Sequence, residues 1–240
     1  MSEKITLSNE GTAAIITMHK GEDNAFNGPF LDEISESLNE VKKNDSYRTL
    51  IVTSSLEKSF CTGYDLGWWM QNAKAEGVLE AFFEKMNSML KELSLFPKPV
   101  IAAINGHIFG QGIFFAGCMD YRIMRDDRGW VNLPEVNINI PFVPSQIAIL
   151  REILPPASMR DMAFLGKKYS PIEAKELGFI DELTELAQLQ NKALEKANEY
   201  SKVNAEAFAE IKFRIRKPLA DIIEKDDIPY IKAALKKSRG

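Results

Sequence analysis

The chain has 240 residues, of which 45% are hydrophobic and 27% are charged, and its formal net charge is −4 at pH 7. This composition is that of a globular protein with a sizeable core, and it excludes wholesale disorder. The negative net charge and a pI near 5.4 argue against nucleic acid or an anionic membrane surface as the main partner. Any anionic ligand is therefore expected to be held by local features of the protein.

Cysteine and histidine are scarce, with two of each in the chain. Cys61 and Cys118 do not form a CxxC pair, so neither a disulfide framework nor a zinc site is expected. The polar start MSEKITLSNEG has no apolar signal core, and no apolar run approaches the roughly 20 residues of a membrane helix. The end Ser238-Arg239-Gly240 differs from a Ser-Lys-Leu peroxisomal address. We therefore expect a cytoplasmic protein without membrane insertion.

The first half of the chain alternates short strands with amphipathic helices. Two strands are expected within residues 4–19, and a third at residues 49–53. Apolar residues recur at helical spacing over residues 31–41 and again over residues 79–93, and the second of these helices must end before two prolines. Residues 100–104 are a continuous apolar run, which is typical of a strand buried on both faces.

The second half of the chain becomes increasingly helical. Ser170-Pro171-Ile172-Glu173 has the pattern of a capping box with proline at the first helical position, and Gly178 is expected to close that helix. Phe179-Ile180-Asp181 is expected to be the last strand. The whole pattern predicts an α/β fold with substantial parallel pairing, divided into a core at residues 1–184 and a helical region at residues 185–240.

Two glycine-containing segments each follow an expected strand. In FCTGYDL, Gly63 allows the backbone to bend so that a following N–H points outward, and Asp65 is suited to cap the next helix. In NGHIFGQG, residues 105–112, the turn opens a helix and presents free N–H groups to developing negative charge. The second segment is neither a Walker A loop nor a dinucleotide fingerprint. Taken alone, each segment is also compatible with an ordinary strand-to-helix turn.

In this order, the two segments resemble the crotonase, or enoyl-CoA hydratase/isomerase, family. The resemblance covers roughly residues 13–183 and is carried by Asn24-Ala25-Phe26, FCTGYDL, KPVIAAINGHIFGQG, Asp120-Tyr121-Arg122, LPEVNI and EAKELGFID. The ordered set is most similar to the monofunctional Δ3,Δ2-enoyl-CoA isomerases. It implies a crotonase-like spiral of ββα units with a helical C-terminal region for subunit association. It also implies a homotrimer or a dimer of trimers.

The resemblance also implies an acyl-coenzyme A thioester as substrate. No separate cofactor is expected, because coenzyme A is part of the substrate, and no metal is expected, because no Cys/His cluster has the spacing of metal ligands. The thioester oxygen is expected between the peptide N–H groups of Tyr64 and Gln111, which would stabilise the enolate that forms when the α-proton leaves. Relatives often have glycine at the position of Gln111. The remaining substrate-binding residues that the resemblance implies are Asn24, Ala25 and Phe26 around the adenine end of coenzyme A, together with Thr62, Asp65, Leu66 and Phe114.

The resemblance places Glu135 at one catalytic carboxylate position and Phe114 at a second, where hydratases of the family carry glutamate. Hydration needs one group for water and another for the carbon proton, whereas a single carboxylate is sufficient to move a double bond from C3 to C2. Phe114 is unable to hold a nucleophilic water. Apolar neighbours within residues 130–140 are expected to raise the pKa of Glu135. Without the resemblance, Glu135 after Pro134 is also compatible with a surface glutamate.

The sequence therefore predicts an isomerase that converts 3-enoyl-CoA to 2-enoyl-CoA through a dienolate, with Glu135, Tyr64 and Gln111 as catalytic residues. Another enolate-forming member of the family (a hydratase, a decarboxylase or a carbon–carbon bond-forming enzyme) is the alternative among enzymes. A catalytically silent acyl-CoA-binding protein is the alternative from another class.

Three further clusters of residues carry predictions, and the first two have two interpretations each. The run Trp68-Trp69-Met70 fits an acyl pocket and fits core packing equally well. A basic cluster between Lys212 and Lys217 fits contact with nucleotide phosphates or, more simply, a solvated helix. Apolar positions on the same segment, including Ile211 and Ile215, need a partner surface and predict self-association.

Overall fold

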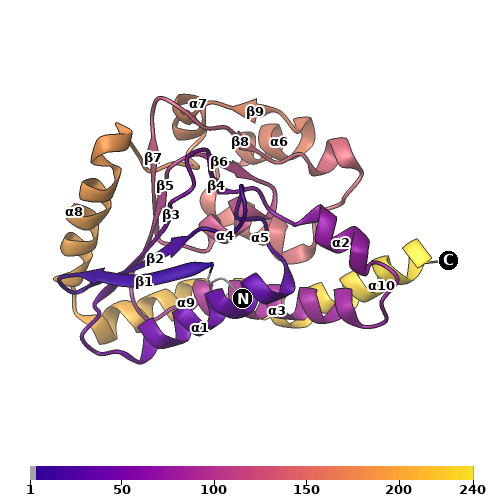
Figure 1. Ribbon diagram of the computed structural model, residues 1–240, viewed down its shortest axis with the longest axis horizontal. Helices are drawn as coiled ribbons and strands as arrows, with labels where there is room; N and C mark the ends of the chain where they lie inside the picture. Colours follow the sequence, from indigo (N-terminus) through magenta and orange to yellow (C-terminus); the bar gives the residue numbers. More distant parts are fainter. Residues whose placement is uncertain (1–3, 240) are drawn as a thin grey trace.

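The computed structural model describes residues 4–239, and two sheets lie at its centre (Figure 1). The larger sheet contains, in spatial order, β1 (Ile5–Glu10), β2 (Ala13–Met18), β3 (Thr49–Ser54), β5 (Val100–Ile104), β7 (Tyr121–Arg125) and β10 (Glu182–Thr184). The smaller sheet contains β4 (Ser59–Cys61), β6 (His107–Phe109), β8 (Val131–Asn132) and β9 (Lys168–Tyr169).

The chain passes from the larger sheet to the smaller one three times. In the pairs β3–β4, β5–β6 and β7–β8, the first strand lies in the larger sheet and the second in the smaller sheet. The helices that follow these pairs are α2 (Leu66–Asn72) and α3 (Val78–Ser94), α4 (Gln111–Gly117), and η1 (Glu135–Ile138) with α5 (Pro144–Ile153). This arrangement confirms the predicted α/β spiral of ββα units.

The parallel part of the larger sheet is covered on both faces. In β5, Ile101 and Ala103 pack with residues of α8 (Leu189–Ser201), whereas Val100, Ala102 and Ile104 belong to the main core. Figure 1 shows α8 along one side of this sheet and α1 (Gly28–Lys43) with α3 below it. The strand expected to be buried on both faces is therefore confirmed, because a parallel sheet in such a fold carries helices on each face.

The helices expected from their apolar spacing form as α1 and α3. Asn27 caps α1 by accepting a hydrogen bond from the N–H of Phe30 at 3.1 Å. The predicted capping box opens α7 (Pro171–Glu176), where the carboxylate of Glu173 accepts from the N–H of Ser170 at 2.8 Å. The capping box of α7 is therefore confirmed, whereas the Asn27 cap of α1 was not predicted.

The predicted last strand was wrong by three residues. The strand is Glu182–Thr184, which pairs in parallel with β7, and Phe179–Asp181 precede it. The N–H groups of Phe179 and Ile180 both donate to the carbonyl of Ala174, which closes α7 and leaves these residues outside the sheet. Phe179 is buried in the core just after α7, so its apolar character reflects burial behind a helix and not a place in a strand.

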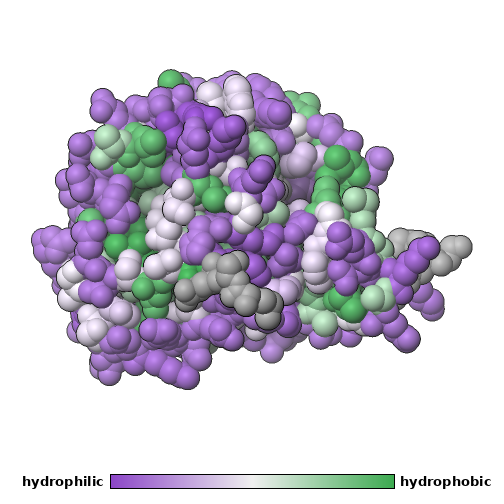
Figure 2. Space-filling model, viewed as in Figure 1, coloured by the Kyte–Doolittle hydropathy of each residue, from purple (hydrophilic) through white to green (hydrophobic). Residues whose placement is uncertain are grey.

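After residue 185 the described chain is helical. It comprises η2 (Leu186–Gln188), α8, α9 (Ala205–Ile222), the π-helical turn η3 (Ile223–Asp227) and α10 (Ile228–Arg239). In Figure 1, α9 and α10 run along the base of the molecule beside α3. Within residues 4–239, no helix combines the length and apolar character needed to span a membrane. The face in Figure 2 is mainly hydrophilic, with small, separate hydrophobic areas.

The basic cluster of α9 is paired with acidic side chains of the same chain. The ion pairs are Lys212 with Asp120, Arg214 with Glu210, Arg216 with Glu152, and Lys217 with Asp221. These pairs favour a structural role over contact with nucleotide phosphates. On the same helix, Ile211 and Ile215 are 58% and 64% exposed. Self-association through this helix, like the division of the chain at residue 184, stays a prediction.

Candidate active site

The site lies where three strands of the smaller sheet end. β4, β6 and β8 run parallel, so their carboxyl ends meet at the same edge. β4 leads to Tyr64, β6 leads to Gln111, and β8 leads to Glu135. The three residues predicted to be catalytic are therefore brought together, and all three line one cavity.

Glycine allows the first two of these loops to touch. Gly63 has a φ of +93°, and a Cβ atom there would stand 3.0 Å from the peptide nitrogen of Gln111 and 3.0 Å from the carbonyl oxygen of Phe109. Glycine alone fits both the backbone conformation and the close approach. Gln111 is the first residue of α4, so its N–H has no partner within the helix. Among residues 4–239, no hydrogen-bond acceptor is paired with the peptide N–H of Tyr64 or Gln111.

The segment predicted to wrap coenzyme A braces the Gly63–Tyr64 loop from behind. Phe26 donates its N–H to the carbonyl of Gly63 at 2.7 Å and accepts the N–H of Asp65 at 2.9 Å. Asn24, which has a φ of +54°, donates from Nδ2 to the carbonyl of Phe60 at 3.0 Å. These bonds fix the direction in which the loop leaves β4.

The other predicted substrate-binding residues divide between the wall of the cavity and its support. Thr62 and Leu66 line the cavity. Asp65 caps α2 by accepting the N–H of Trp68 at 2.9 Å. Lys20 joins two of the supporting residues, because its Nζ donates to the carbonyl of Ala25 at 2.6 Å and to Asp65 at 2.8 Å. Contact of coenzyme A with the supporting residues stays a prediction.

Glu135 is the first residue of η1 and is only 6% exposed. Its Oε1 lies 3.1 Å from the place that a Cβ of Gly110 would occupy, so glycine at that position lets the carboxylate approach the Gln111 loop. Its Oε2 is buried, with no hydrogen-bond partner among the described residues. Burial raises the pKa of Glu135 from 4.5 to about 7, because the ionised form loses its hydration. The predicted rise is therefore found.

The groups that surround Glu135 are only partly those expected. Ile138 and Ile140 line the cavity, whereas the exposed Trp130 and Val136 do not contribute to its wall. Much of the apolar wall comes from α2, α3 and α10, which are remote from Glu135 in the sequence. The side chains from these helices are Leu66 and Trp69 from α2, Phe83 from α3, and Tyr230, Ile231, Ala234 and Leu235 from α10.

The cavity has a volume of about 360 Å³. Among the described residues that line it, Glu135 is the only carboxylate, and no Lys, Arg or His side chain takes part. Sequence analysis did not identify the contribution of α10, because apolar spacing marks the buried face of a helix but not the surface that this face covers.

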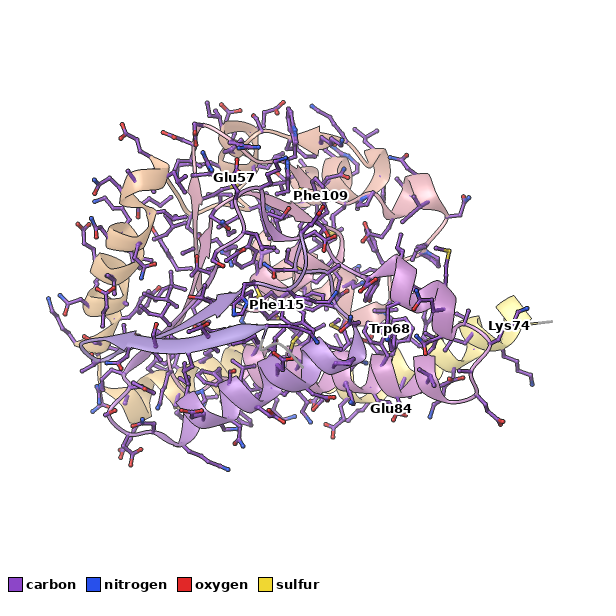
Figure 3. The ribbon with its side chains drawn as sticks, viewed as in Figure 1. Glu57, Trp68, Lys74, Glu84, Phe109 and Phe115 are labelled. Carbon is purple, nitrogen blue, oxygen red and sulfur yellow. The ribbon has the colours of Figure 1, made fainter. Side chains whose placement is uncertain are left out.

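The three residues Trp68, Trp69 and Met70 have three different environments. Trp69 lines the cavity, as the acyl-pocket interpretation predicts. Trp68 points from α2 towards α3, where its ring centroid lies 5.2 Å from that of Phe82 (Figure 3). Met70 is 75% exposed. Successive residues of a helix point in directions about 100° apart, so one short run divides between cavity, core and solvent.

Phe114 is fully buried and does not contribute to the wall of the cavity. Its ring packs edge-to-face against Phe142, with the ring centroids 5.6 Å apart. The neighbouring Phe115, at the centre of Figure 3, packs edge-to-face against Phe26, with the ring centroids 5.4 Å apart. Phe114 thus supports the site from the core, and its direct contact with substrate stays a prediction.

Three polar side chains that line the cavity, those of Tyr64, Gln111 and Gln146, are joined by hydrogen bonds. The Oε1 atom of Gln111 accepts two hydrogen bonds, from the hydroxyl of Tyr64 and from Nε2 of Gln146, each at 2.9 Å. The Oε1 atom of Gln146 accepts the N–H of Val143 at 2.9 Å. Burial raises the pKa of the Tyr64 hydroxyl, with further contributions from the carboxylates of Glu135 and Asp227, so the hydroxyl stays protonated and able to donate.

Sequence analysis missed Gln146 and its support. Glutamine at the third position of a helix that begins with Pro144 is a capping signal, and this signal was present in the sequence. The start of α5 is also held by Asp227 of η3, a fully buried carboxylate that accepts from the N–H of Ser145 at 2.9 Å and from its hydroxyl. This second contact joins segments far apart in the sequence and has no local signal.

Comparisons with known proteins show the family to which the chain is similar. The profile of the family described as enoyl-CoA hydratase/isomerase matches residues 8–228. The chain is 30% identical to a carnitinyl-CoA dehydratase of Escherichia coli O157:H7, with 99% of this chain and 89% of the relative covered. It is 28% identical to enoyl-CoA delta isomerase 3 of Arabidopsis thaliana, with 73% and 75% covered.

A solved structure is similar over nearly the whole chain. An enoyl-CoA hydratase from Mycobacterium marinum superposes with a TM-score of 0.86, covering 96% of this chain and 99% of that one at 24% identity. At this identity, the likeness is one of fold.

Proposed function

The chain belongs to the enoyl-CoA hydratase/isomerase family, and we propose that it is a Δ3,Δ2-enoyl-CoA isomerase. Membership of the family makes it an enzyme that acts on acyl-CoA. The observation that carries the finer proposal concerns the described residues 4–239. Among them, Glu135 is the single carboxylate in an otherwise uncharged and mainly apolar cavity, beside the N–H groups of Tyr64 and Gln111, which have no acceptor.

In the proposed reaction, the Glu135 carboxylate removes a proton from C2 of 3-enoyl-CoA. The electron pair of that C–H bond moves into the conjugated system and gives a dienolate, with the negative charge on the thioester oxygen. The N–H groups of Tyr64 and Gln111 donate to this oxygen, and the loss of one such donor costs about 3–4 kcal/mol in other enzymes. The protonated Glu135 then returns the proton to C4, which leaves the double bond between C2 and C3.

The surroundings of Glu135 support this reaction over hydration. Addition of water requires one group to activate the water and another to protonate carbon. Among the described residues, the wall of the cavity offers one carboxylate only, and the hydroxyl of Tyr64 already donates to Gln111. The second candidate is hydration or dehydration at the same enolate site, and it is favoured by the carnitinyl-CoA dehydratase among the relatives.

Product analysis separates the two candidates. We expect 3-enoyl-CoA to give 2-enoyl-CoA of unchanged mass, and we expect 2-enoyl-CoA to gain little or no water. Products are identified by mass spectrometry and NMR, with reactions lacking protein as the control for spontaneous isomerisation. Hydration of 2-enoyl-CoA at a rate that rivals isomerisation would rule out the proposed function in favour of the second candidate.

The pKa of Glu135 predicts the pH dependence of the reaction. Only the ionised carboxylate accepts the C2 proton, and it is ionised above its pKa of about 7. We therefore expect kcat/KM to rise about tenfold per pH unit below this pKa and to level off above it. Initial rates from about pH 5.5 to about pH 8.5 test this. A flat profile over that range would contradict a base with this pKa.

A further inference from the structure

The turn that carries the peptide N–H of Gln111 is held through the side chain of Gln111. Gln111 lies between Gly110 and Gly112, and glycine allows more backbone conformations than any other residue. The side-chain oxygen of Gln111 accepts from the hydroxyl of Tyr64 and from Nε2 of Gln146, each at 2.9 Å. These two bonds restrict the turn, and the first of them joins the two residues that are proposed to donate to the thioester oxygen.

Gln146 is held in turn by a carboxylate that lies outside the cavity. The residue before it in α5, Ser145, donates its N–H at 2.9 Å and its hydroxyl to the two carboxylate oxygens of Asp227. The first N–H groups of a helix have no partner within it, so a carboxylate at this place satisfies one of them and meets the positive end of the helix dipole. A line of hydrogen-bonded contacts therefore runs from Asp227 through the start of α5 to Gln111.

The position of Asp227 is set by the turn that joins α9 to α10. Asp227 is the last residue of the π-helical turn η3, a rare conformation that occurs frequently at functional sites. Nδ2 of Asn87 in α3 donates to the carbonyl of Ile223, the first residue of η3, at 3.4 Å. Asp227 is fully buried and does not line the cavity. Its carboxylate is thus fixed between helices of the cavity wall but lies behind that wall.

We infer that Asp227 is a positioning residue of the proposed reaction, which acts through Ser145 and Gln146 on the peptide N–H of Gln111. With Asp227 in place, this N–H keeps the direction in which it donates to the negative charge that develops on the thioester oxygen. Donors that are fixed before the reaction stabilise an enolate without a cost of reorientation. Asp227 itself does not touch the substrate, and the inference rests on the proposed function.

Asp227→Leu tests this inference, because leucine has the branched shape of aspartate but no acceptor for Ser145. We expect kcat for isomerisation of 3-hexenoyl-CoA to fall about tenfold, less than the loss caused by removal of a whole donor. The Kd of hexanoyl-CoA, measured by calorimetry, should stay within about threefold, because the thioester oxygen of a bound ground state carries little negative charge. Asp226→Asn, at an exposed position of the same turn, is the matched control and should leave kcat unchanged.

A double-mutant cycle tests whether Asp227 acts through Gln146. Gln146→Met keeps the approximate volume of the side chain but removes the bond to Gln111, so it should lower kcat as well. In the Gln146→Met background, Asp227→Leu should cause no further loss of kcat, because the line of contacts is already broken. If Asp227→Leu does not fold, Ser145→Ala, which removes only the hydroxyl bond, is used in the same cycle with an expected loss of about threefold.

Infrared spectra of bound hexanoyl-CoA, labelled with carbon-13 at the thioester carbon, report on the two donors without turnover. Hydrogen bonds to a carbonyl oxygen lower its stretching frequency, so wild type should lower this frequency relative to free hexanoyl-CoA. Asp227→Leu should shift it back towards the free value, whereas Asp226→Asn should not. If Asp227 served stability alone, its loss would lower the free energy of unfolding and leave the carbonyl frequency unchanged.

The outcomes distinguish this inference from the proposed function. If folded Asp227→Leu keeps the wild-type kcat and carbonyl frequency, or if its loss of kcat multiplies with that of Gln146→Met, the inference is wrong and the acyl-CoA site stands. If wild type lowers the frequency but does not isomerise 3-hexenoyl-CoA, the proposed function fails, and the infrared comparison of the variants alone supports or overturns the inference. If wild type does not lower the frequency, the N–H groups do not bind the thioester oxygen, and both fail.

Discussion

Glu135→Gln is expected to lower kcat for isomerisation at least about 100-fold and to leave the Kd for an acyl-CoA close to that of the unmodified protein. Glutamine keeps the size and polarity of the side chain but is unable to accept and return a proton. Steady-state rates and calorimetric titrations measure the two effects separately. Glu36→Gln, at an exposed position of α1, is the matched control and should leave both unchanged.

Glu135→Gln should also change how the free energy of unfolding depends on pH, an effect that is not expected at an exposed glutamate. The pKa of Glu135 is about 7 in the folded protein and 4.5 ordinarily, so folding favours its protonated form. Wild-type stability is therefore lost as the pH rises from 4.5 to about 7, by on the order of 3 kcal/mol. Glu135→Gln should be more stable than wild type in urea unfolding at pH 8, and the difference should shrink towards pH 4.5.

Near-normal turnover in a folded Glu135→Gln variant would exclude Glu135 as the base.

Gly63→Ala is expected to lower kcat/KM at least about 100-fold, because it disturbs both N–H donors at once. A Cβ at Gly63 would stand 3.0 Å from the peptide nitrogen of Gln111 and would hold a non-glycine residue at a φ of +93°. The backbone strain is expected to lower the free energy of unfolding by about 1–3 kcal/mol. Initial rates and urea unfolding measure these losses.

Gly11→Ala is the control that separates the effect of backbone strain on stability from the effect of displaced N–H donors on the rate. Gly11 also has a positive φ, +58°, but a Cβ there would meet no atom within 4 Å, and it lies in the β1–β2 turn away from the cavity. We expect Gly11→Ala to show a loss of stability of the same order with an unchanged rate. If Gly63→Ala and Gly11→Ala both keep the normal rate, the Gly63 loop does not present a catalytic donor.

Local signals predicted the parts of the fold that depend on nearby residues. The continuous apolar run predicted β5 and the capping box predicted the start of α7, each from a few consecutive residues, and both formed as expected. β8 and β9 have two residues each, too few to show a periodicity, and they were not predicted. β10 was misplaced because burial of Phe179 behind α7 resembles burial in a strand.

The candidate site was likewise predicted only in part. Tyr64, Gln111 and Glu135 were identified by resemblance, and the parallel strands that precede them explain why they meet. Two further parts of the site depend on contacts between distant segments: the wall from α10 and the bond of Asp227 to Ser145. No pattern within one segment encodes such contacts, because each segment fixes only its own buried face.

The position of α10 has a thermodynamic consequence. Because Ile231 and Leu235 line the cavity, an acyl chain that fills it contacts α10 as well as the catalytic loops. Linkage is reciprocal: if docking of the helix strengthens ligand binding, the ligand strengthens docking of the helix by the same free energy. If acyl-CoA binds in this cavity as proposed, we therefore expect local opening of α10 to become rarer when the cavity is occupied.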